Sequence, residues 1–187
     1  MKQDFFDDTE FKGLNDIEPG IYECCILKNC VLPKANLSGR VFIDCVFENC
    51  DLSAANINGT SFQNTEFKNC KILGAEFGQC NLLNFEVTFK NCILDHSSFY
   101  RMDLHDTDFS SCKVHGADFA ETQLNNTIFH ECDLQESRFT QCNLEKADFS
   151  TAINYTINPI NNKIKGAKFS LPAVIGLLDE FEINLTQ

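Results

Sequence analysis

Tryptophan is absent from this chain of 187 residues, and proline and methionine are scarce, at four and two residues. No apolar run reaches the about 18 residues that a membrane-spanning helix needs, so the sequence predicts no such helix. The opening residues, MKQDFFDDTE, are acidic and lack the apolar stretch of a secretory signal. We therefore expect a cytoplasmic protein that has no membrane partner.

Positive charge is also scarce. Lysine and arginine total 15 against 27 aspartates and glutamates, which gives a net charge of −12 and an isoelectric point near 4.6. Proteins that bind nucleic acid neutralise its phosphates with basic side chains, so this balance speaks against direct nucleic-acid binding. It leaves open a basic partner, or a surface that imitates a nucleic acid.

Catalytic signatures are missing as well. The chain contains no G-x-x-x-x-G-K-[ST], G-x-G-x-x-G, H-E-x-x-H or G-x-S-x-G run. Among its four histidines, His115 is expected to stack beside Asp95 as a surface pair, with no nucleophile nearby. We therefore expect no enzyme activity, no cofactor and no metal site.

Phenylalanine and cysteine are in excess, at 18 and 11 residues. Both recur every 20 residues and both intervals lengthen once to 22 at the same point, with cysteine at 30, 50, 70, 92, 112 and 132 and phenylalanine at 47, 67, 89, 109, 129, 149 and 169. Such spacing is typical of a stack of similar coils. The cysteines then form one interior row of reduced thiols that pack without bridging. Cys24, next to Cys25, is expected to point outward.

A finer period of five underlies each coil. A large apolar residue, here called the centre, recurs from Tyr22 to Leu82 and again from Phe89 to Phe149, and a small slot residue usually precedes it by two positions. Residues two apart in an extended segment point to the same side, so both face inward, and four segments close one coil. This arrangement requires a two-residue insertion near 83–88.

The centres sort onto four walls. Wall A carries Leu82, Leu104, Leu124 and Leu144; wall B carries Phe47, Phe67, Phe89, Phe109, Phe129 and Phe149; wall C carries Leu32, Leu52, Ile72, Leu94, Val114 and Leu134; wall D carries Phe77, Phe99, Phe119 and Phe139. Arg40 and Met102 occupy slots on wall A. Because an unpaired arginine is rarely buried, we expect Arg40 to leave the interior through a local distortion of its coil.

Units such as AdFaE (Ala117 to Glu121) and CdLqE (Cys132 to Glu136) resemble the A(D/N)LXX motif of the pentapeptide repeat family. The resemblance covers roughly residues 20 to 156. It implies an all-β fold, a right-handed quadrilateral parallel β-helix of about 6.5 coils, roughly 31 Å long at about 4.8 Å per coil.

Three parts are expected along the chain: an N-terminal cap at 1–20, the repeat at 21–156 and a C-terminal cap at 157–187. The last part is predicted to contain a short α-helix at about 171–181, with Pro172 in its first turn. Its apolar residues either cover the last coil or join two copies into a homodimer, and one helix can do both. The candidate dimer residues are Leu171, Val174, Ile175, Leu178, Phe181, Ile183 and Leu185.

Acidic residues concentrate in the distal half of the predicted rod. Residues 102–151 hold ten acidic side chains against three basic ones, whereas residues 22–101 hold eight against seven. The candidate acidic surface comprises Asp103, Asp106, Asp108, Asp118, Glu121, Glu131, Asp133, Glu136, Glu145 and Asp148. It is either a solvated face that aids solubility or a contact surface for a basic partner.

Among members of the family, the chain is most similar in design to the quinolone-resistance (Qnr-type) proteins and the microcin B17 immunity protein. That resemblance implies an acidic, dimeric bacterial rod that imitates DNA, binds DNA gyrase or topoisomerase IV, and gives resistance to a quinolone or a toxin. The alternative is an interaction scaffold with an unrelated partner and no effect on topoisomerases, because a fold does not fix a function.

Overall fold

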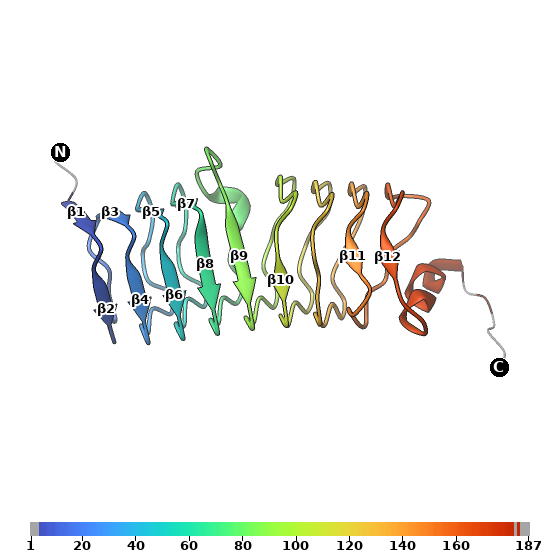
Figure 1. Cartoon of the computed structure of the whole chain (residues 1–187), viewed down its shortest axis with the longest axis horizontal. Helices are drawn as coiled ribbons and strands as arrows, with labels where there is room; N and C mark the ends of the chain where they lie inside the picture. Colours follow the sequence, from blue (N-terminus) through green and yellow to red (C-terminus); the bar gives the residue numbers. More distant parts are fainter. Residues whose placement is uncertain (1–3, 182, 184–187) are drawn as a thin grey trace.

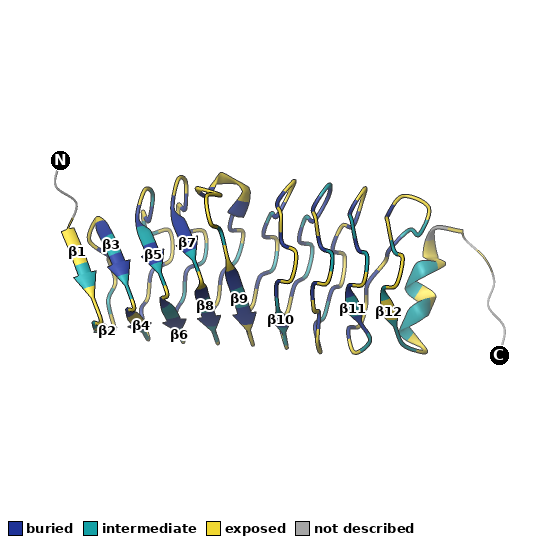
Figure 2. Cartoon of the chain, turned by 45° about the horizontal axis from the view of Figure 1, so that its top comes forward, coloured by how far each residue is buried: buried dark blue, intermediate teal, exposed yellow. Residues whose placement is uncertain are grey.

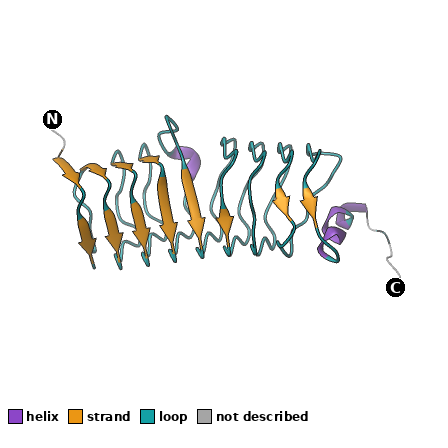
Figure 3. Ribbon diagram, in the orientation of Figure 1, coloured by secondary structure: helices purple, strands orange, loops and turns teal. Residues whose placement is uncertain are grey.

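The computed structural model describes residues 4–181 and residue 183, which form a straight rod with its two ends far apart (Figure 1). The chain winds through about 8 turns of a right-handed, four-walled parallel solenoid, so the predicted fold class is confirmed. Strands and turns make up nearly all of the rod (Figure 3). Helical turns occur at η1 (Phe77–Gln79), shortly before the insertion, and at the C-terminal end. No helix within the described residues is long and apolar enough to cross a membrane.

The strands pair only with the equivalent strand of the next coil, always in parallel. Wall A has a four-stranded sheet: β1 (Asp4–Asp7), β3 (Gly20–Glu23), β5 (Val41–Ile43) and β7 (Ser61–Gln63). Wall B has a six-stranded sheet: β2 (Glu10–Lys12), β4 (Ile26–Lys28), β6 (Val46–Glu48), β8 (Thr65–Lys68), β9 (Val87–Lys90) and β10 (Phe109–Ser110). Farther along wall B, β11 (Asp148–Phe149) pairs with β12 (Lys168–Phe169), and single bridges join the remaining coils.

Coils continue at both ends of the repeat. Asp4 pairs with Gly20, an offset of 16 residues, so the described part of the expected N-terminal cap forms a short first coil. At the other end, Phe169 pairs with Phe149 and stacks on it at 5.4 Å, which extends the solenoid beyond residue 156.

Buried residues line the inside of the coils (Figure 2), and most of the largest fully buried side chains are phenylalanines. Successive rings on wall B stack with centroids 4.8 to 5.3 Å apart, and those on wall D with centroids 4.8 to 5.0 Å apart. The two stacks meet edge to face at 5.6 to 6.1 Å. Each buried ring contributes about 1.5–3 kcal/mol of hydrophobic stabilisation, and each ring pair about 0.5–1.5 kcal/mol more.

The insertion changes one predicted centre. Leu82 is 48% exposed, so its assignment to the interior of wall A was wrong. Phe85 turns inward instead and meets Phe77 edge to face at 6.4 Å, while Val87 is buried beside it. The two extra residues let the chain form a loop over 82–86 in which Phe85, a larger apolar residue, takes the inner position.

Many slot residues are cysteine, serine or threonine, whose side chains can donate a hydrogen bond. Cys70 Sγ donates to the carbonyl of Phe47 at 3.3 Å, and Thr60 Oγ1 to the carbonyl of Leu37 at 2.8 Å, each reaching 23 residues back to the preceding coil. Cysteine, serine and threonine therefore both fit the slot and pair a buried carbonyl. Burial raises the pKa of the Cys80 thiol to about 12, and all cysteines among the described residues are free. The predicted structural role of the cysteine row is confirmed.

The Arg40 side chain also donates hydrogen bonds to carbonyls of the preceding coil. The expectation that it would leave the interior was therefore wrong. Its side chain is buried, and Nε donates to the carbonyls of Ile17 at 3.0 Å and Glu18 at 3.2 Å, while Nη2 also donates to Ile17. The coil is undistorted here, since Ser61 N–H still pairs with the carbonyl of Arg40 at 2.9 Å. The first coil supplies carbonyl acceptors 23 and 22 residues back, and these receive the guanidinium.

The C-terminal segment is not the predicted α-helix. It forms two 3-10 turns, η2 (Ala173–Leu177) and η3 (Asp179–Phe181), with bonds such as Leu178 N–H to the Ile175 carbonyl at 2.8 Å. Gly176 lies against the last coil, where its carbonyl accepts the Ile157 N–H at 3.0 Å and a Cβ would stand 1.9 Å from the Tyr155 carbonyl oxygen. This close backbone approach ties the segment to the rod end and tightens it into 3-10 geometry.

Candidate interaction surfaces

Within the described residues, buried side chains fill the inside of each coil, and the exposed polar groups lie on the outer walls. Hollows on the described surface include one of about 190 Å³ and one of about 540 Å³, both open to solvent. Within residues 4–181 and 183, no group of three or more histidine, cysteine, aspartate or glutamate side chains could hold a metal ion. Surfaces that could bind a partner are therefore sought among the charged residues of the walls.

The structure does not gather the ten predicted acidic residues on one face. Strand pairing assigns Asp103 to wall A, Asp108 and Asp148 to wall B, Asp133 to wall C and Asp118 to wall D. The other five lie in the turn that follows a wall: Asp106 and Glu145 after wall A, Glu131 after wall B, Glu136 after wall C and Glu121 after wall D. The acidic half of the rod is thus four surfaces with different charge patterns, and they are described in turn.

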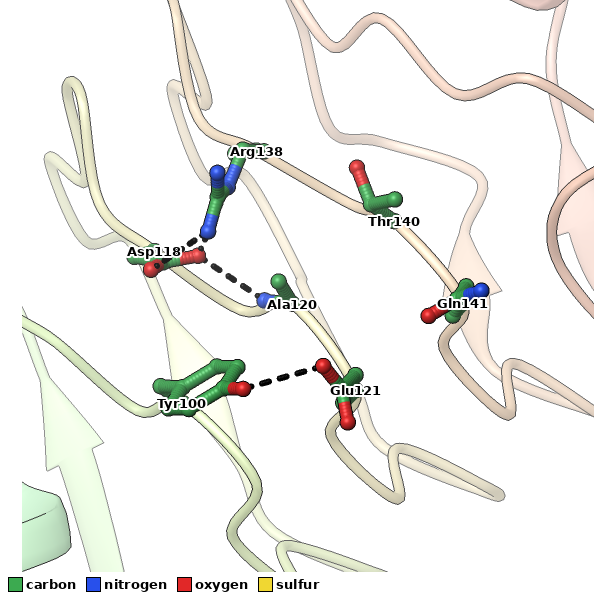
Figure 4. Close-up of a pocket in the computed structure, with 7 residues that line it drawn as sticks. All are labelled: Tyr100, Asp118, Ala120, Glu121, Arg138, Thr140 and Gln141. Carbon is green, nitrogen blue, oxygen red and sulfur yellow. Dashed lines mark hydrogen bonds and ion pairs between the residues drawn. The ribbon is translucent and has the colours of Figure 1, made fainter.

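Wall D is neutralised by its own ion pairs (Figure 4). Arg138 binds Asp118 through two bonds of 3.0 and 2.9 Å, and Arg101 Nε donates to Glu121 at 2.7 Å. The Tyr100 hydroxyl also donates to Glu121 at 3.0 Å, and the Arg101 guanidinium lies 4.8 Å from the centre of the Tyr100 ring. Tyr100, Asp118, Glu121 and Arg138 border a hollow of about 290 Å³. Asp118 and Glu121 therefore offer little free negative charge.

Walls B and C carry the other acidic residues of this half on two adjacent faces. We call the outer surface of these two walls, from Asp108 at the start of wall B to Glu136 in the turn that ends wall C, the B–C edge; it comprises Asp108, Glu131, Asp133, Glu136 and Asp148. Asp108 accepts a hydrogen bond from the Ser110 hydroxyl at 2.6 Å, and Glu136 accepts one from the Gln135 amide at 3.4 Å. Neither forms an ion pair among the described residues, although the charge of Asp108 acts on Lys90.

Three carboxylates of the B–C edge have basic neighbours. Glu131 is one of them, with His130 Nε2 3.7 Å from its Oε1. Partial burial raises the pKa of Asp148, but hydrogen bonds from Lys168, at 2.8 Å, and from Ser150 outweigh it and hold the pKa at about 2. Burial acts in the same direction on Asp133, where bonds from Asn154 and His115 lower the pKa overall. Both residues stay charged near neutral pH.

His115 lies in the predicted column with Asp95, but its backbone and not its ring contacts Asp95. Its backbone N–H donates to Asp95 Oδ1 at 3.0 Å, while ring Nε2 lies 2.8 Å from Asp133 Oδ2 in the next coil. The predicted pair of Asp95 with His115 therefore exists through the backbone. The neighbouring carboxylate that the ring meets is one coil farther along.

Wall A carries acidic and basic residues at opposite ends. Asp103 bonds to His105 Nδ1 at 2.7 Å, a contact that raises the pKa of His105, and Asp106 lies beside them. The loop 82–86 overhangs this group and helps to enclose a hollow of about 520 Å³. Sequence reasoning missed the importance of this loop, whose Leu83 is 69% exposed.

The C-terminal turns expose part of the predicted dimer face. Leu171, Ile175, Leu178, Phe181 and Ile183 are exposed, whereas Val174 is half-buried. Ala173 and Leu177 pack against the core of the rod. The segment thus covers the last coil and presents apolar side chains outward at the same time. Leu185, the last predicted dimer residue, lies outside the described residues.

Comparisons with known proteins agree with this architecture. The family model described as pentapeptide repeat region matches residues 21–86 and 83–156. Among curated proteins, none matches the sequence significantly. Among solved structures, the chain is similar to QnrB1, a plasmid-mediated fluoroquinolone resistance protein. One trypsin-treated variant of QnrB1 gives a TM-score of 0.72 with 16% identity, over 98% of this chain and 92% of that chain.

A second trypsin-treated variant gives a TM-score of 0.59 with 17% identity, over 97% of each chain. The full-length form of QnrB1 gives a TM-score of 0.50 with 20% identity, over 96% of this chain and all of that chain. At this level of identity the likeness establishes the fold.

Proposed function

Because the chain belongs to the pentapeptide repeat family, we propose that it is a non-catalytic binding protein whose outer walls contact another protein. The observation that carries this proposal is the division of the coil into a filled interior and a charged exterior. Centres and slots are buried along the rod, and the hollows that remain are open surface features. A partner therefore meets only the walls.

The B–C edge is the surface best suited to a basic partner. It holds five carboxylates. Lys168 and His115 each bond to one of them, His130 Nε2 lies 3.7 Å from Glu131 Oε1, and Lys113 precedes Asp133 in its column. Asp108 and Asp148 belong to one column, with Ile128 bridged between them, so two coil steps of about 4.8 Å separate their charges. A rigid row of negative charge can align with a basic protein surface and speed its association.

The partner that we propose is DNA gyrase or topoisomerase IV in a bacterial cytoplasm, with the B–C edge in place of DNA. The shared fold with QnrB1, a fluoroquinolone resistance protein, supports this choice, as does the acidic edge. A reducing cytoplasm also suits the row of free thiols.

The test is DNA supercoiling by gyrase, measured with and without a quinolone while the concentration of this protein is varied. Wild type is expected to inhibit supercoiling or to relieve quinolone inhibition. A variant with Asp108→Asn, Glu131→Gln and Glu136→Gln is expected to lose that effect. A matched control, Asp7→Asn, Asp8→Asn and Glu23→Gln, removes the same charge from the first coils and is expected to keep it. Absence of any effect or binding would rule out a topoisomerase partner.

A second candidate function is that of a scaffold for a protein unrelated to topoisomerases. The neutralised wall D supports it, because Arg101, Arg138 and Tyr100 give this wall a patterned surface that does not resemble DNA. Affinity capture with wild type and with an Arg101→Ala, Arg138→Ala variant discriminates the two. A partner retained by the B–C edge variant and lost by the wall D variant would favour the scaffold.

We also propose that two copies join through the C-terminal turns. Ile175, Leu178 and Phe181 are exposed together there, and covering them removes apolar area from water. Light scattering after size exclusion is expected to give a dimer for wild type and a monomer for Ile175→Asp. A monomeric wild type would refute this contact.

A further inference from the structure

Wall A beyond the loop 82–86 carries opposite charges that are separated along the rod. Strand bridges join Asp103 to Gln123, Gln123 to Asn143, and Asn143 to Lys163, so these four side chains form one straight column. The column begins with a carboxylate and ends with an ammonium group, three coil steps or about 14 Å away. In its neutral middle, the Asn143 amide donates to Gln123 at 3.2 Å. We call this surface, from Asp103 to Lys165, the A stripe.

The residues beside the column repeat its polarity. Asp106 lies next to Asp103, whereas Lys165 and Lys146 lie near Lys163. In the part of the chain that the structure describes, Asp106, Lys146, Lys163 and Lys165 take part in no ion pair, unlike the charges of wall D. With Glu145, the A stripe holds three acidic and three basic residues and has no net charge, although the whole chain has a net charge of −12. A second acidic rod can therefore approach this wall without the repulsion that the B–C edge would cause.

The order of charges is self-complementary. A two-fold axis in the plane of the contact, perpendicular to the rod and midway between Gln123 and Asn143, reverses the direction of a second copy. It brings Asp103 opposite Lys163 of that copy and sets Gln123 opposite its Asn143. Lys165 then faces the turn that contains Asp106. Such an isologous contact forms every charge pair twice.

The loop selects the same alignment for a steric reason. It stands out from the rod between β8 and β9 beyond the neighbouring turns, with Leu82 and Leu83 exposed (Figure 1). It precedes Asp103 by one coil, so in the charge-matched alignment it passes beyond the last coil of the second copy on wall A. A shift that moved the loop over the other copy's wall would push the rods apart. The hollow beneath the loop, lined by Glu86, Asp103 and Asp106, faces the lysines of the second copy.

We propose that the A stripe binds a second copy of this chain side by side and antiparallel, over the C-terminal halves of the two rods. The overlap is about four coils, or about 19 Å long, which is small for a protein interface. The contact is therefore weak and transient, and it depends on salt because its attraction is ionic and exposed. It is distinct from the contact proposed for the C-terminal turns.

Charge reversal tests the contact with a built-in control. Sedimentation velocity is run over a concentration series at about 50 and about 500 mM NaCl, on an Ile175→Asp background that removes any association through the C-terminal turns. Association of this background protein is expected at low salt and is expected to weaken at least about tenfold at high salt. An acid-reversed variant, Asp103→Lys and Asp106→Lys, is expected to be monomeric, as is a base-reversed variant, Lys163→Asp and Lys165→Asp.

Mixing the two variants in equal amounts restores both sets of opposite charges and is expected to yield a heterodimer. Combining all four changes in one chain restores them in a homodimer. Circular dichroism establishes that each variant is folded. A background protein that stays monomeric throughout the concentration series would overturn the proposal, as would folded variants whose association is unchanged. Failure of both the mixture and the fourfold variant to associate would overturn it as well. None of these outcomes bears on gyrase binding, which concerns the B–C edge.

Discussion

Replacing Arg40 by alanine is expected to destabilise the rod by about 2–3 kcal/mol, with the loss confined to its N-terminal end. The guanidinium donates to the carbonyls of Ile17 and Glu18, and hydrogen bonds that involve a charged group contribute about 1.5–3 kcal/mol. Removing Arg40 also removes a desolvation cost, because this cation is 94% buried and lacks a carboxylate partner among the described residues. Alanine would, however, leave the space of the side-chain stem unfilled. The lost hydrogen bonds and packing together are expected to exceed the desolvation cost that is removed.

Replacing Arg40 by threonine tests the hydrogen-bond donor apart from the positive charge. Thr60 occupies the equivalent slot one coil later, and its hydroxyl donates to the Leu37 carbonyl at 2.8 Å. Arg40→Thr can therefore offer a neutral donor to Ile17 without burying a charge. It is expected to recover about 1 kcal/mol of the stability that Arg40→Ala loses.

Urea unfolding followed by circular dichroism measures the total change, and hydrogen exchange with mass spectrometry locates it. Exchange is expected to accelerate at amides that bind the first coil, such as Val31 N–H, which donates to the Leu14 carbonyl at 2.8 Å. Peptides from residues 100–150 should be unaffected, because each coil contacts only its neighbours. An Arg40→Ala protein as stable as wild type, or faster exchange along the whole rod, would refute this reasoning.

Three other perturbations test the interior and the edge. Phe119→Ala is expected to cost about 3–5 kcal/mol and Phe169→Ala clearly less, because the Phe119 ring is fully buried whereas Phe169 is half-buried at the rod end; equal losses in urea would contradict this. Iodoacetamide is expected to label Cys24 ahead of the ten buried thiols, yet more slowly than a free cysteine near pH 8, because desolvation and nearby carboxylates raise its pKa; peptide mass spectrometry reads this out. Asp148→Asn is expected to lower the melting temperature at pH 7. Because the folded pKa of about 2 lies below the unfolded value of about 4, the difference from wild type should shrink as pH falls from about 5 to about 2, and a constant difference would dismiss the Lys168 pair.

Much of the fold could be predicted because every coil presents the same environment at the same position. Centres such as Phe119 and slots such as Cys112 recur in successive coils with similar residue types, and the structure buries them alike. The loop at the insertion has no equivalent in the other coils. Spacing located it, but the choice between Leu82 and Phe85 as the inner residue depended on loop geometry that occurs once in the chain.

The other differences have a similar origin in contacts that occur once. Arg40 is tolerated because the short first coil places the Ile17 carbonyl within reach, and a rule about buried arginine contains no such information. The helical spacing at 171–181 was real, yet the approach of Gly176 to Tyr155 decided the backbone geometry. The acidic surface is a different case. The wall of each carboxylate could have been predicted from the number of residues that separate it from the nearest centre. Counting the charges of a whole segment ignores that position.

The separation of interior from exterior lets each wall carry its own pattern of charges. Inward residues fix the stacking, while outward residues one coil apart stand at a constant spacing whatever their chemistry. Wall D neutralises its own charges, the B–C edge keeps them negative, and the A stripe separates the two signs along its length. Changes to exposed charges on one wall should therefore alter one interaction and leave the others intact. Surface charges contribute little to folding, so the Asp103→Lys and Asp108→Asn variants should unfold at nearly the wild-type urea concentration. A large loss of stability in either would mean that the walls and the core are coupled, and the assignment of separate surfaces would fail.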